Sequence, residues 1–328
     1  MTPAEVGGYC SRAVSEERPF ISVVVPLYCC EAFVAELHER LVRTLSPIAS
    51  RFEIVLVNDA SPQGDWQAVR NLAARDERVK AINLSRNFGQ HYAITAGVDH
   101  AEGDWVVVMD GDLQDPPEEI ARMFAKAAEG YDIVFGVKPK RNHGFVKRLM
   151  SRTFTRVLAY LMDTDLDNSV THFSIVSRKV VDNLRLFRER NRSYAFFLRW
   201  MGFHVGYVEV EHHARPSGES SYTLRKLLRL AFELMVSQSD KPLRVSVVFG
   251  FITASLAFAA GVINIVRYFF WATPVEGWTS VIVSLYFIGG ILLMALGVLG
   301  LYVGKIFEEA KGRPLYVVKD TINFPKAS

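Results

Sequence analysis

The residues best suited to chemistry lie in one short segment, Asp110-Gly111-Asp112-Leu113-Gln114-Asp115, which follows the apolar run 105–109. Ligands of open α/β sheets bind just beyond the carboxyl ends of the strands. Two carboxylates spaced i, i+2 at such an end supply hard oxygen ligands, and Mg²⁺ is usually held by one or two carboxylates plus substrate phosphates. The same segment contains ordinary turn formers, so a plain turn after a buried strand explains it equally well at this point.

The elements around this segment predict a mostly parallel α/β sheet. Strands are expected at 21–26, 52–59, 79–84, 105–109 and 131–136, and helices at 31–45, 65–75, 90–101 and 117–130. Strands that alternate with helices of this length imply βαβ units. Three of the strands end in polar residues, at Asp59, at Ser85-Arg86-Asn87 and at Asp110. Three polar ends on one edge of a sheet favour a ligand site over three unrelated turns.

The overall composition excludes some classes of protein. A formal net charge of +3 over 328 residues is too small to indicate a nucleic-acid-binding protein. The cysteines Cys10, Cys29 and Cys30 form neither a metal-ligand spacing nor a disulfide framework, which is typical of a reducing compartment. The first twenty residues are polar and lack an apolar core, so we expect no secretory signal peptide.

Two long apolar segments near the C-terminus predict a transmembrane hairpin. Residues 245–271 and 278–303 each exceed the roughly 20 residues that cross a bilayer core, and the second has no charged residue. Lysines and arginines flank the outer ends of the hairpin, so the positive-inside rule places the N-terminal region in the cytoplasm. The second segment carries Gly289, Gly290, Gly297 and Gly300, and Gly304 follows it directly. Such glycines indicate close helix packing, either within the hairpin or between the subunits of a homo-oligomer.

Two further helices are expected to lie at a membrane surface. Residues 145–162 and 223–237 each place an apolar stripe opposite lysines and arginines, a pattern typical of interfacial helices at anionic bilayers. The alternative, an ordinary surface helix with a solvated basic face, would be favoured in a soluble chain without the hairpin. The sequence thus predicts a globular domain over 1–237 with both interfacial helices, two transmembrane helices within 238–308, and a tail over 309–328. A short strand at 313–319 would return that tail to the domain.

Motifs along the chain resemble those of a known enzyme family. In order they are Val25-Pro26-Leu27-Tyr28, Val57-Asn58-Asp59-Ala60-Ser61, Leu84-Ser85-Arg86-Asn87-Phe88-Gly89, Asp110-Gly111-Asp112-Leu113-Gln114-Asp115-Pro116, Arg215-Pro216-Ser217-Gly218-Glu219-Ser220-Ser221-Tyr222 and Lys241-Pro242-Leu243-Arg244. Together they span about residues 20–320 and resemble the family-2 glycosyltransferases that act on polyprenyl phosphates. This group includes dolichol-phosphate mannose synthase and bacterial undecaprenyl-phosphate sugar transferases.

The resemblance implies a fold and a reaction. The fold is a GT-A domain, which is a Rossmann-like α/β architecture, followed by the membrane hairpin. The enzyme would be a metal-dependent glycosyltransferase of the hexosyl- or pentosyltransferase class that acts with inversion at the anomeric carbon. It would move one sugar from a nucleotide-diphospho-sugar to polyprenyl (undecaprenyl) phosphate at the cytoplasmic face of a bacterial inner membrane. The product would serve the modification of cell-envelope glycans such as lipopolysaccharide or O-antigen.

The resemblance also implies roles for individual residues. Those implied to bind the nucleotide are Pro26, Tyr28, Asp59, Ser61 and Asp110. Those implied to hold Mg²⁺ or Mn²⁺ are Asp110, Asp112 and Gln114. Those implied to contact the diphosphate or the acceptor phosphate are Lys138, Arg141, Arg215 and Ser220. The implied catalytic residues are Asp112, Asp115 and, on the acceptor side, Thr171 or His172. Because a phosphate monoester has a second pKa of about 6, the acceptor is largely ionised at neutral pH and needs no strong general base.

Two positions depart from the family pattern. The family usually has Asn-Glu after the tyrosine of the first strand, whereas this chain has Cys29-Cys30, so a nucleotide contact is lost or is provided by Glu31. Many relatives have Asp-Phe-Arg-Leu where this chain has Thr171-His172-Phe173-Ser174, so Thr171 or His172 replaces an acidic residue near the acceptor. His172 either contacts the phosphate or sugar, or is a structural histidine at a strand edge. The change suggests a donor other than the commonest glucose or mannose type.

Two other functions fit part of the sequence. A processive polysaccharide synthase has the same kind of domain but carries Gln-x-x-Arg-Trp and more spans, whereas this chain has Phe196-Phe197-Leu198-Arg199-Trp200 and two spans. A catalytically inert membrane scaffold with the same fold would have no need of the carboxylates Asp110 and Asp112. Both stand as alternatives to the transferase.

Overall fold

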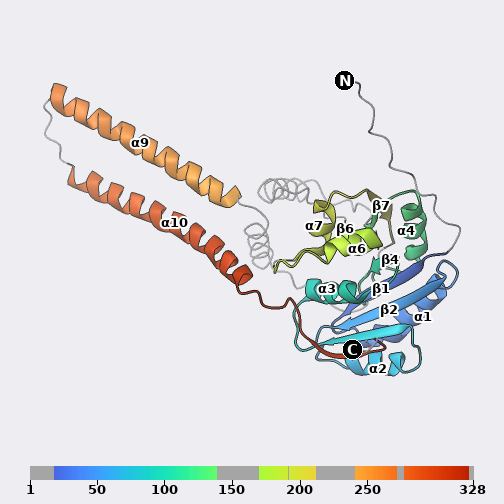
Figure 1. Cartoon of the computed structure of the whole chain (residues 1–328). Helices are drawn as coiled ribbons and strands as arrows, with labels where there is room; N and C mark the ends of the chain where they lie inside the picture. The colour runs from blue at the N-terminus through green and yellow to red at the C-terminus, as the bar shows by residue number, and fades with distance from the viewer. Residues whose placement is uncertain (1–17, 139–169, 191, 212–240, 272–276, 325–328) are drawn as a thin grey trace, which may run out of the picture. The chain divides into compact units, whose positions relative to one another are not determined.

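The computed structural model describes residues 18–138, 170–190, 192–211, 241–271 and 277–324 (Figure 1). The predicted interfacial helices at 145–162 and 223–237, and with them Arg141, Arg215 and Ser220, lie outside these residues. Contacts divide the chain into two units. The α/β unit comprises Met1–Arg141, Asn168–Gly218 and Pro314–Ser328, and the second unit comprises Asn142–Asp167 and Glu219–Arg313.

An eight-stranded sheet forms the centre of the α/β unit in the described part of the chain, with the order β7-β5-β6-β4-β1-β2-β3-β8. The strands are β1 (Phe20–Leu27), β2 (Arg51–Asn58), β3 (Val79–Leu84), β4 (Trp105–Val108), β5 (Ile133–Val137), β6 (Val170–Ser177), β7 (Val205–Glu209) and β8 (Val318–Ile322). The β1–β2, β1–β4, β2–β3 and β5–β7 pairs are parallel, whereas β6 and β8 pair in the antiparallel sense. The predicted mostly parallel α/β sheet is confirmed.

Helices cover both faces of this sheet. They are the short 3-10 helix η1 (Glu31–Phe33), α1 (Val34–Leu45), α2 (Asp65–Ala73), α3 (Gln90–His100), α4 (Glu119–Ala128), α6 (Arg178–Leu184) and α7 (Tyr194–Trp200). Side chains alternate along β1, so Val23 packs into a core with α1, α2 and α4, and Val24 packs into another with α3, α6 and α7. Burial of both faces explains why the strands read as continuous apolar runs rather than as alternating ones.

Helix α3 lies very close to β1. A Cβ at Gly97 would collide with the Val24 side chain, so glycine is required where the helix crosses the strand. This close approach fixes α3 on the sheet. As a result, the first turn of α3, with Gln90 and His91, is held at the edge where β1, β2 and β4 end.

Strand β6 is the main element that the sequence pattern does not indicate. It lies between β4 and β5 and is antiparallel to both. Its last pairing with β4 joins Val108 to Ser174, so Thr171 and His172 extend past the end of β4, next to the segment that begins at Asp110. The buried Ser174 hydroxyl that interrupts the apolar pattern is paired with the Tyr194 hydroxyl at 3.0 Å.

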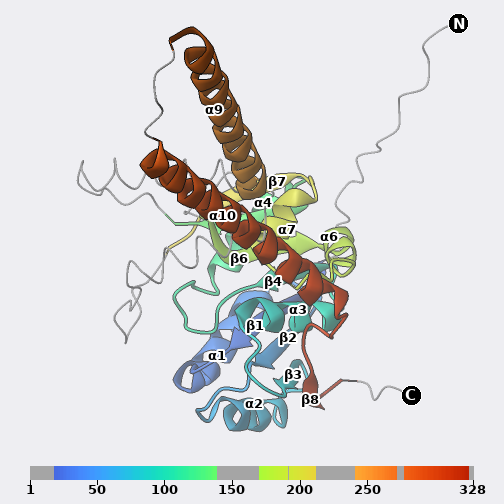
Figure 2. The same cartoon turned by 90° about the vertical axis from the view of Figure 1, so that its left-hand side faces the viewer.

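The chain returns to the α/β unit after its last long helix. Strand β8 pairs with β3 at the edge of the sheet, as Figure 2 shows. It begins at Val318, within the predicted segment 313–319 but later than its start. Nearby, the Tyr316 hydroxyl donates to Asp99 Oδ2 at 2.8 Å, and Asn323 Nδ2 donates to the carbonyl oxygens of Ala73 and Val79. The tail is therefore fastened to the unit by hydrogen bonds on both sides of β8.

The second unit contains two long apolar helices, α9 (Lys241–Trp271) and α10 (Trp278–Ala310). Within them, Leu243–Ile263 and Val283–Ala310 are long and apolar enough to cross a membrane, and neither is buried inside the structure. A 21-residue helix is about 31 Å long, close to the thickness of a bilayer core. A Cβ at Gly289, Gly297 or Gly300 would meet no atom within 4 Å. These glycines are thus not used for packing between the described parts of α9 and α10.

Candidate functional site

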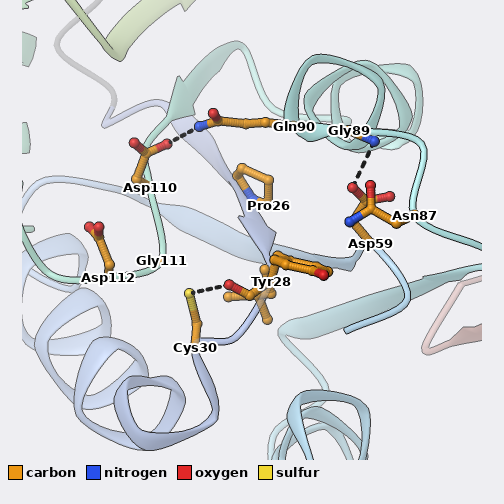
Figure 3. A pocket seen from close by; sticks show the side chains of 11 residues that line it. Pro26, Tyr28, Cys30, Asp59, Asn87, Gly89, Gln90, Asp110, Gly111 and Asp112 are labelled. Atoms are coloured by element: carbon orange, nitrogen blue, oxygen red, sulfur yellow. Dashed lines mark hydrogen bonds between the residues drawn. The ribbon is translucent and has the colours of Figure 1, made fainter. Parts of the chain in front are cut away.

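A cavity of about 270 Å³ opens where β1, β2, β3 and β4 end. Its lining includes Pro26 and Tyr28 at the end of β1, Asp59 directly after β2, and Asp110 and Asp112 in the loop after β4 (Figure 3). These residues come from three separate segments of the sequence, and four of the five proposed nucleotide-binding residues are among them. The fifth, Ser61, is not part of the lining.

The carboxylate of Asp59 is used on both sides by the protein itself. Its Oδ1 accepts the backbone N–H of Phe88 and its Oδ2 accepts that of Gly89, both at 2.8 Å. Gly89 presents its N–H from a backbone with φ of 105°, a conformation that glycine adopts without strain. Burial raises the pKa of Asp59, while these two hydrogen bonds and the Arg86 charge oppose the rise. Asp59 therefore holds the β3–α3 loop against the end of β2 while one edge lines the cavity.

The carboxylate of Asp110 lies near two other carboxylates. Its Oδ1 accepts a hydrogen bond from Gln90 Nε2 at 2.6 Å. Burial raises the pKa of Asp110, His172 opposes the rise, and the neighbouring carboxylates of Asp112 and Asp115 add to it. Like charges that are held together in a buried place favour the protonated form. A cation bound between these carboxylates would remove that repulsion.

The other two carboxylates near Asp110, those of Asp112 and Asp115, lie in the same loop after β4. Asp112 Oδ1 accepts the backbone N–H of Gln114 at 3.2 Å, across Leu113, whose φ is 58°. Asp115 is buried and, like Gln114, is not part of the cavity lining. In the described part of the chain, no group of three or more His, Cys, Asp or Glu side chains is arranged to hold a metal ion alone. Asp110 and Asp112 fit a Mg²⁺ or Mn²⁺ ion whose other ligands are substrate phosphates and water.

His172, on β6, lies close enough to Asp110 to affect its charge, and it contacts His91 in the first turn of α3. The rings of His172 and His91 form an edge contact with centroids 5.3 Å apart. Burial lowers the pKa of His91 to about 4, with smaller contributions in the same direction from His172 and Arg192. His91 Nδ1 is buried without a hydrogen-bond partner. Sequence reasoning missed His91, although its position in the first helical turn after a polar strand end was a usable signal.

Thr171 and His172 differ in how their side chains are used. The Thr171 hydroxyl donates to the carbonyl oxygen of Gly136 and accepts the backbone N–H of Phe173, both at 3.1 Å. This hydroxyl thus bridges the paired strands β5 and β6. His172, in contrast, opposes the rise in the pKa of Asp110, and its ring contacts that of His91. Lys138 is exposed directly after β5.

The loops at the ends of β1 and β2 explain three other residues. Ser61 Oγ accepts the backbone N–H groups of Cys29 and Gln63, so this hydroxyl joins the two loops. Glu31 Oε2 accepts the backbone N–H of Gly64 and does not line the cavity. Cys30 does line it, and burial raises the pKa of its thiol to about 11, so it remains a neutral thiol. Neither Glu31 nor Cys30 supplies the carboxylate that the usual family pattern has here.

The chain is similar to several known proteins. Residues 22–185 match the family described as Glycosyl transferase family 2. The uncharacterized glycosyltransferase YkcC of Bacillus subtilis is 37% identical over 299 residues, which cover 91% of this chain and 93% of that protein. A bactoprenol glucosyl transferase of Shigella phage SfV is 36% identical over 303 residues, which cover 92% and 98%. A solved mannosyltransferase, PcManGT from Pyrobaculum calidifontis in complex with GDP-Man and Mn²⁺, has a TM-score of 0.48 at 16% identity, covering 89% of this chain and 88% of that one.

Proposed function

The chain belongs to glycosyl transferase family 2, and from this premise we propose that it moves one sugar from a nucleotide-diphospho-sugar to a polyprenyl phosphate, with inversion. The observation that carries the proposal is the cavity at the strand ends, which contains Asp110 and Asp112. The acceptor is supported by the similarity to a bactoprenol glucosyl transferase. This similarity extends over nearly the whole chain and therefore includes the two long apolar helices.

In this proposal the nucleoside lies against Pro26, Tyr28 and Asp59. Half of the Tyr28 side chain is exposed at the cavity, which leaves its ring available to stack on a base. Each Asp59 oxygen already accepts one backbone N–H and keeps a lone pair for a ribose or base donor. Ser61 acts indirectly, because its hydroxyl ties the loop of Tyr28 to the loop of Asp59.

Asp110 and Asp112 are proposed to hold Mg²⁺ or Mn²⁺, with Gln114 as an additional ligand. The bound ion would neutralise the negative charge that develops on the departing diphosphate. Gln90 fixes the orientation of Asp110 through its 2.6 Å hydrogen bond. Asp115 is a positioning residue that acts through its charge on Asp110 rather than by contact with the substrate.

The acceptor phosphate is proposed to approach on the β6 side of Asp110. His172 is favoured over Thr171 as the residue that orients it, because the Thr171 hydroxyl is engaged by Gly136 and Phe173. Lys138 is available to contribute charge from the end of β5, and the family pattern adds Arg141, Arg215 and Ser220. Since the acceptor phosphate is already ionised, these residues bind and orient it and no side chain has to remove its proton.

The membrane arrangement is part of the same proposal. Lysines and arginines flank the predicted spans 245–271 and 278–303, and they support a bacterial inner-membrane protein whose α/β unit is cytoplasmic. They are Lys241 and Arg244 before the first span, and Lys305, Lys311 and Arg313 after the second. Glycines of α10 that are not needed within the hairpin are available for a homo-oligomer. Chemical crosslinking in detergent that yields monomer alone would contradict that oligomer.

The decisive experiment is transfer of radiolabelled sugar into lipid by the full chain in membranes with added undecaprenyl phosphate. Several labelled nucleotide sugars are needed, because the His172 position suggests an unusual donor, whereas the relative from phage SfV is named for glucose. We expect one donor to give an organic-extractable lipid with a single sugar, and Asp112→Ala to abolish the transfer. Glu39→Ala, which removes an exposed carboxylate on α1, is the matched control and should be active.

Each other outcome has a definite meaning. Products with many sugars per lipid would indicate the processive synthase, and absence of lipid product with every donor would favour the inert scaffold. If Asp112→Ala retained full transfer, the metal assignment would be wrong.

A further inference from the structure

The C-terminal strand β8 is connected to the cavity by a line of side-chain hydrogen bonds. Asp320, on β8, accepts a hydrogen bond through Oδ2 from Asn83 Nδ2 at 3.1 Å. Asn83 Oδ1 in turn accepts from Asn58 Nδ2 at 2.9 Å. Both asparagines are buried, with 7% and 3% of their surfaces exposed, at the ends of β3 and β2. Buried amides of this kind stabilise the fold only when their hydrogen-bond partners are in place.

The line continues into the loops that border the nucleotide cavity. Asn58 Oδ1 accepts the backbone N–H of Ser61 at 3.3 Å. Ser61 Oγ accepts the backbone N–H of Cys29 at 3.1 Å. Asn58 directly precedes Asp59 and Cys29 directly follows Tyr28, and both Asp59 and Tyr28 line the cavity. The hydrogen bonds thus cross four neighbouring strands, from β8 through β3 and β2 to β1.

The line has a fixed direction that begins at Asp320. A carboxylate can only accept, so the NH₂ group of Asn83 must point toward Asp320 and its oxygen toward Asn58. Asn58 must then present its own NH₂ group to Asn83 and its oxygen to the Ser61 N–H. With a donor in place of Asp320, both amides would turn over, and the NH₂ group of Asn58 would meet the N–H of Ser61. The loss of the acceptor on β8 would therefore disturb the hydrogen bonds of the loop beside Asp59.

We propose that Asp320 is a positioning residue for the nucleotide donor: together with Asn83 and Asn58 it sets the loops that carry Tyr28 and Asp59. The inference rests on the proposed function of the cavity as the nucleotide site. It assigns to the segment after the second apolar helix a part in donor binding, although Asp320 itself is exposed and does not line the cavity. The competing explanation is that β8 only closes the edge of the sheet.

Four variants separate the two explanations. Asp320→Asn removes the charge but keeps an oxygen that accepts from Asn83. Asp320→Lys replaces the acceptor with a donor, and its added positive charge alone would strengthen the binding of an anionic nucleotide. Thr321→Ala alters a neighbouring exposed residue of β8 and is the matched control. The pair Asn83→Asp with Asp320→Asn reverses donor and acceptor between β8 and β3, but a carboxylate at position 83 still accepts from Asn58, so the orientation of Asn58 is kept.

The full chain in detergent is titrated calorimetrically with UDP and with GDP, each with Mg²⁺. We expect Asp320→Lys to weaken the bound nucleotide by about three- to tenfold, the range that one net hydrogen bond supplies. Asp320→Asn, Thr321→Ala and the exchanged pair should stay within about twofold of the wild type. In transfer assays the loss should appear in the donor KM and leave kcat unchanged. An equal effect of Asp320→Asn and Asp320→Lys would overturn the proposal.

Hydrogen exchange by mass spectrometry provides a readout that needs no ligand. The amides of Cys29 and Ser61 should exchange faster in Asp320→Lys than in the wild type, while the melting temperature changes little. If the exchange of these two amides is unchanged, the line does not transmit and the proposal fails. If neither nucleotide binds the wild type, the proposed function of the cavity is wrong, and the exchange data still decide whether β8 sets the loops.

Discussion

Asp59 and Asp110 offer a comparison within one edge of the sheet. They follow β2 and β4, the two strands that flank β1, and burial raises the pKa of both carboxyls. Asp59 accepts a backbone N–H on each oxygen. Asp110 accepts from one side-chain amide, with Asp112 and Asp115 near enough to repel it. The first carboxylate is stabilised by the fold, whereas we propose that a bound ligand balances the charge of the second.

We infer that Asp59 maintains the structure in addition to its proposed contact with the nucleoside, whereas Asp110 serves the proposed reaction alone. In sequence both residues look alike, because each is an aspartate after an apolar strand. In the structure their substitution should have different consequences for stability. Loss of Asp59 should lower stability, and neutralisation of Asp110 should lower activity but not stability.

The largest effect is expected on activity. Asp110→Asn keeps an oxygen for Gln90 but reduces the charge available to a cation, so we expect transfer to fall by about a hundredfold or more. The same variant should unfold at an equal or higher temperature than the wild type, because repulsion with Asp112 and Asp115 is relieved. Transfer assays and calorimetric melting measure the two effects. A variant that loses both activity and stability would remove the contrast with Asp59.

The next effect concerns metal binding. Mn²⁺ at about 100 times its Kd should stabilise the wild type by about 2.7 kcal/mol through mass action. Asp110→Asn and Asp112→Ala should show little of this gain, whereas Glu39→Ala should show all of it. Thermal melts with and without Mn²⁺, in buffers treated with chelator, provide the measurement. Equal stabilisation of all four proteins would indicate a site elsewhere.

Stability should respond to Asp59 with the opposite sign. Asp59→Ala removes the acceptor of two backbone N–H groups, and we expect the free energy of unfolding to fall by about 2 kcal/mol. Urea denaturation of the full chain in detergent, with Glu39→Ala beside it, tests this. An unchanged urea midpoint would mean that water replaces the carboxylate at the β3–α3 loop.

The smallest effect is a pH dependence of the metal-free protein. The pKa of Asp110 in the folded state lies above its ordinary value of 3.8, so the folded protein holds this proton more tightly than the unfolded chain. The resulting stabilisation is complete below about pH 3.8 and is lost as the pH rises through the folded-state pKa. Wild type should therefore lose stability relative to Asp110→Asn as the pH rises above about 3.8. Melting temperatures of both proteins over this range, in chelator, check the sign.

Much of the sheet could be predicted from the sequence, because β1 to β5 are buried on both sides and form apolar runs. Strand β6 could not, because Thr171, His172 and Ser174 interrupt its apolar pattern, and the hydroxyls of Thr171 and Ser174 are satisfied by residues distant in the sequence. The convergence of Asp59 and Asp110 followed from the parallel strand order. The difference between them did not, because it depends on where the backbone of Phe88 and Gly89 lies. Likewise, the engagement of Ser61 and Glu31 with backbone N–H groups has no local signature.

The position of β8 has a consequence for the synthesis of the protein. The strand that covers the open edge of β3 follows α10, so the ribosome makes both apolar helices before the sheet can be completed. At usual rates of translation, roughly 10 to 50 seconds pass between the synthesis of β3 and the synthesis of β8. During that time the backbone N–H and C=O groups of β3 form an unprotected edge, which is where foreign strands add and aggregation begins. A nascent chain that stops before codon 318 would keep this edge open for its whole lifetime.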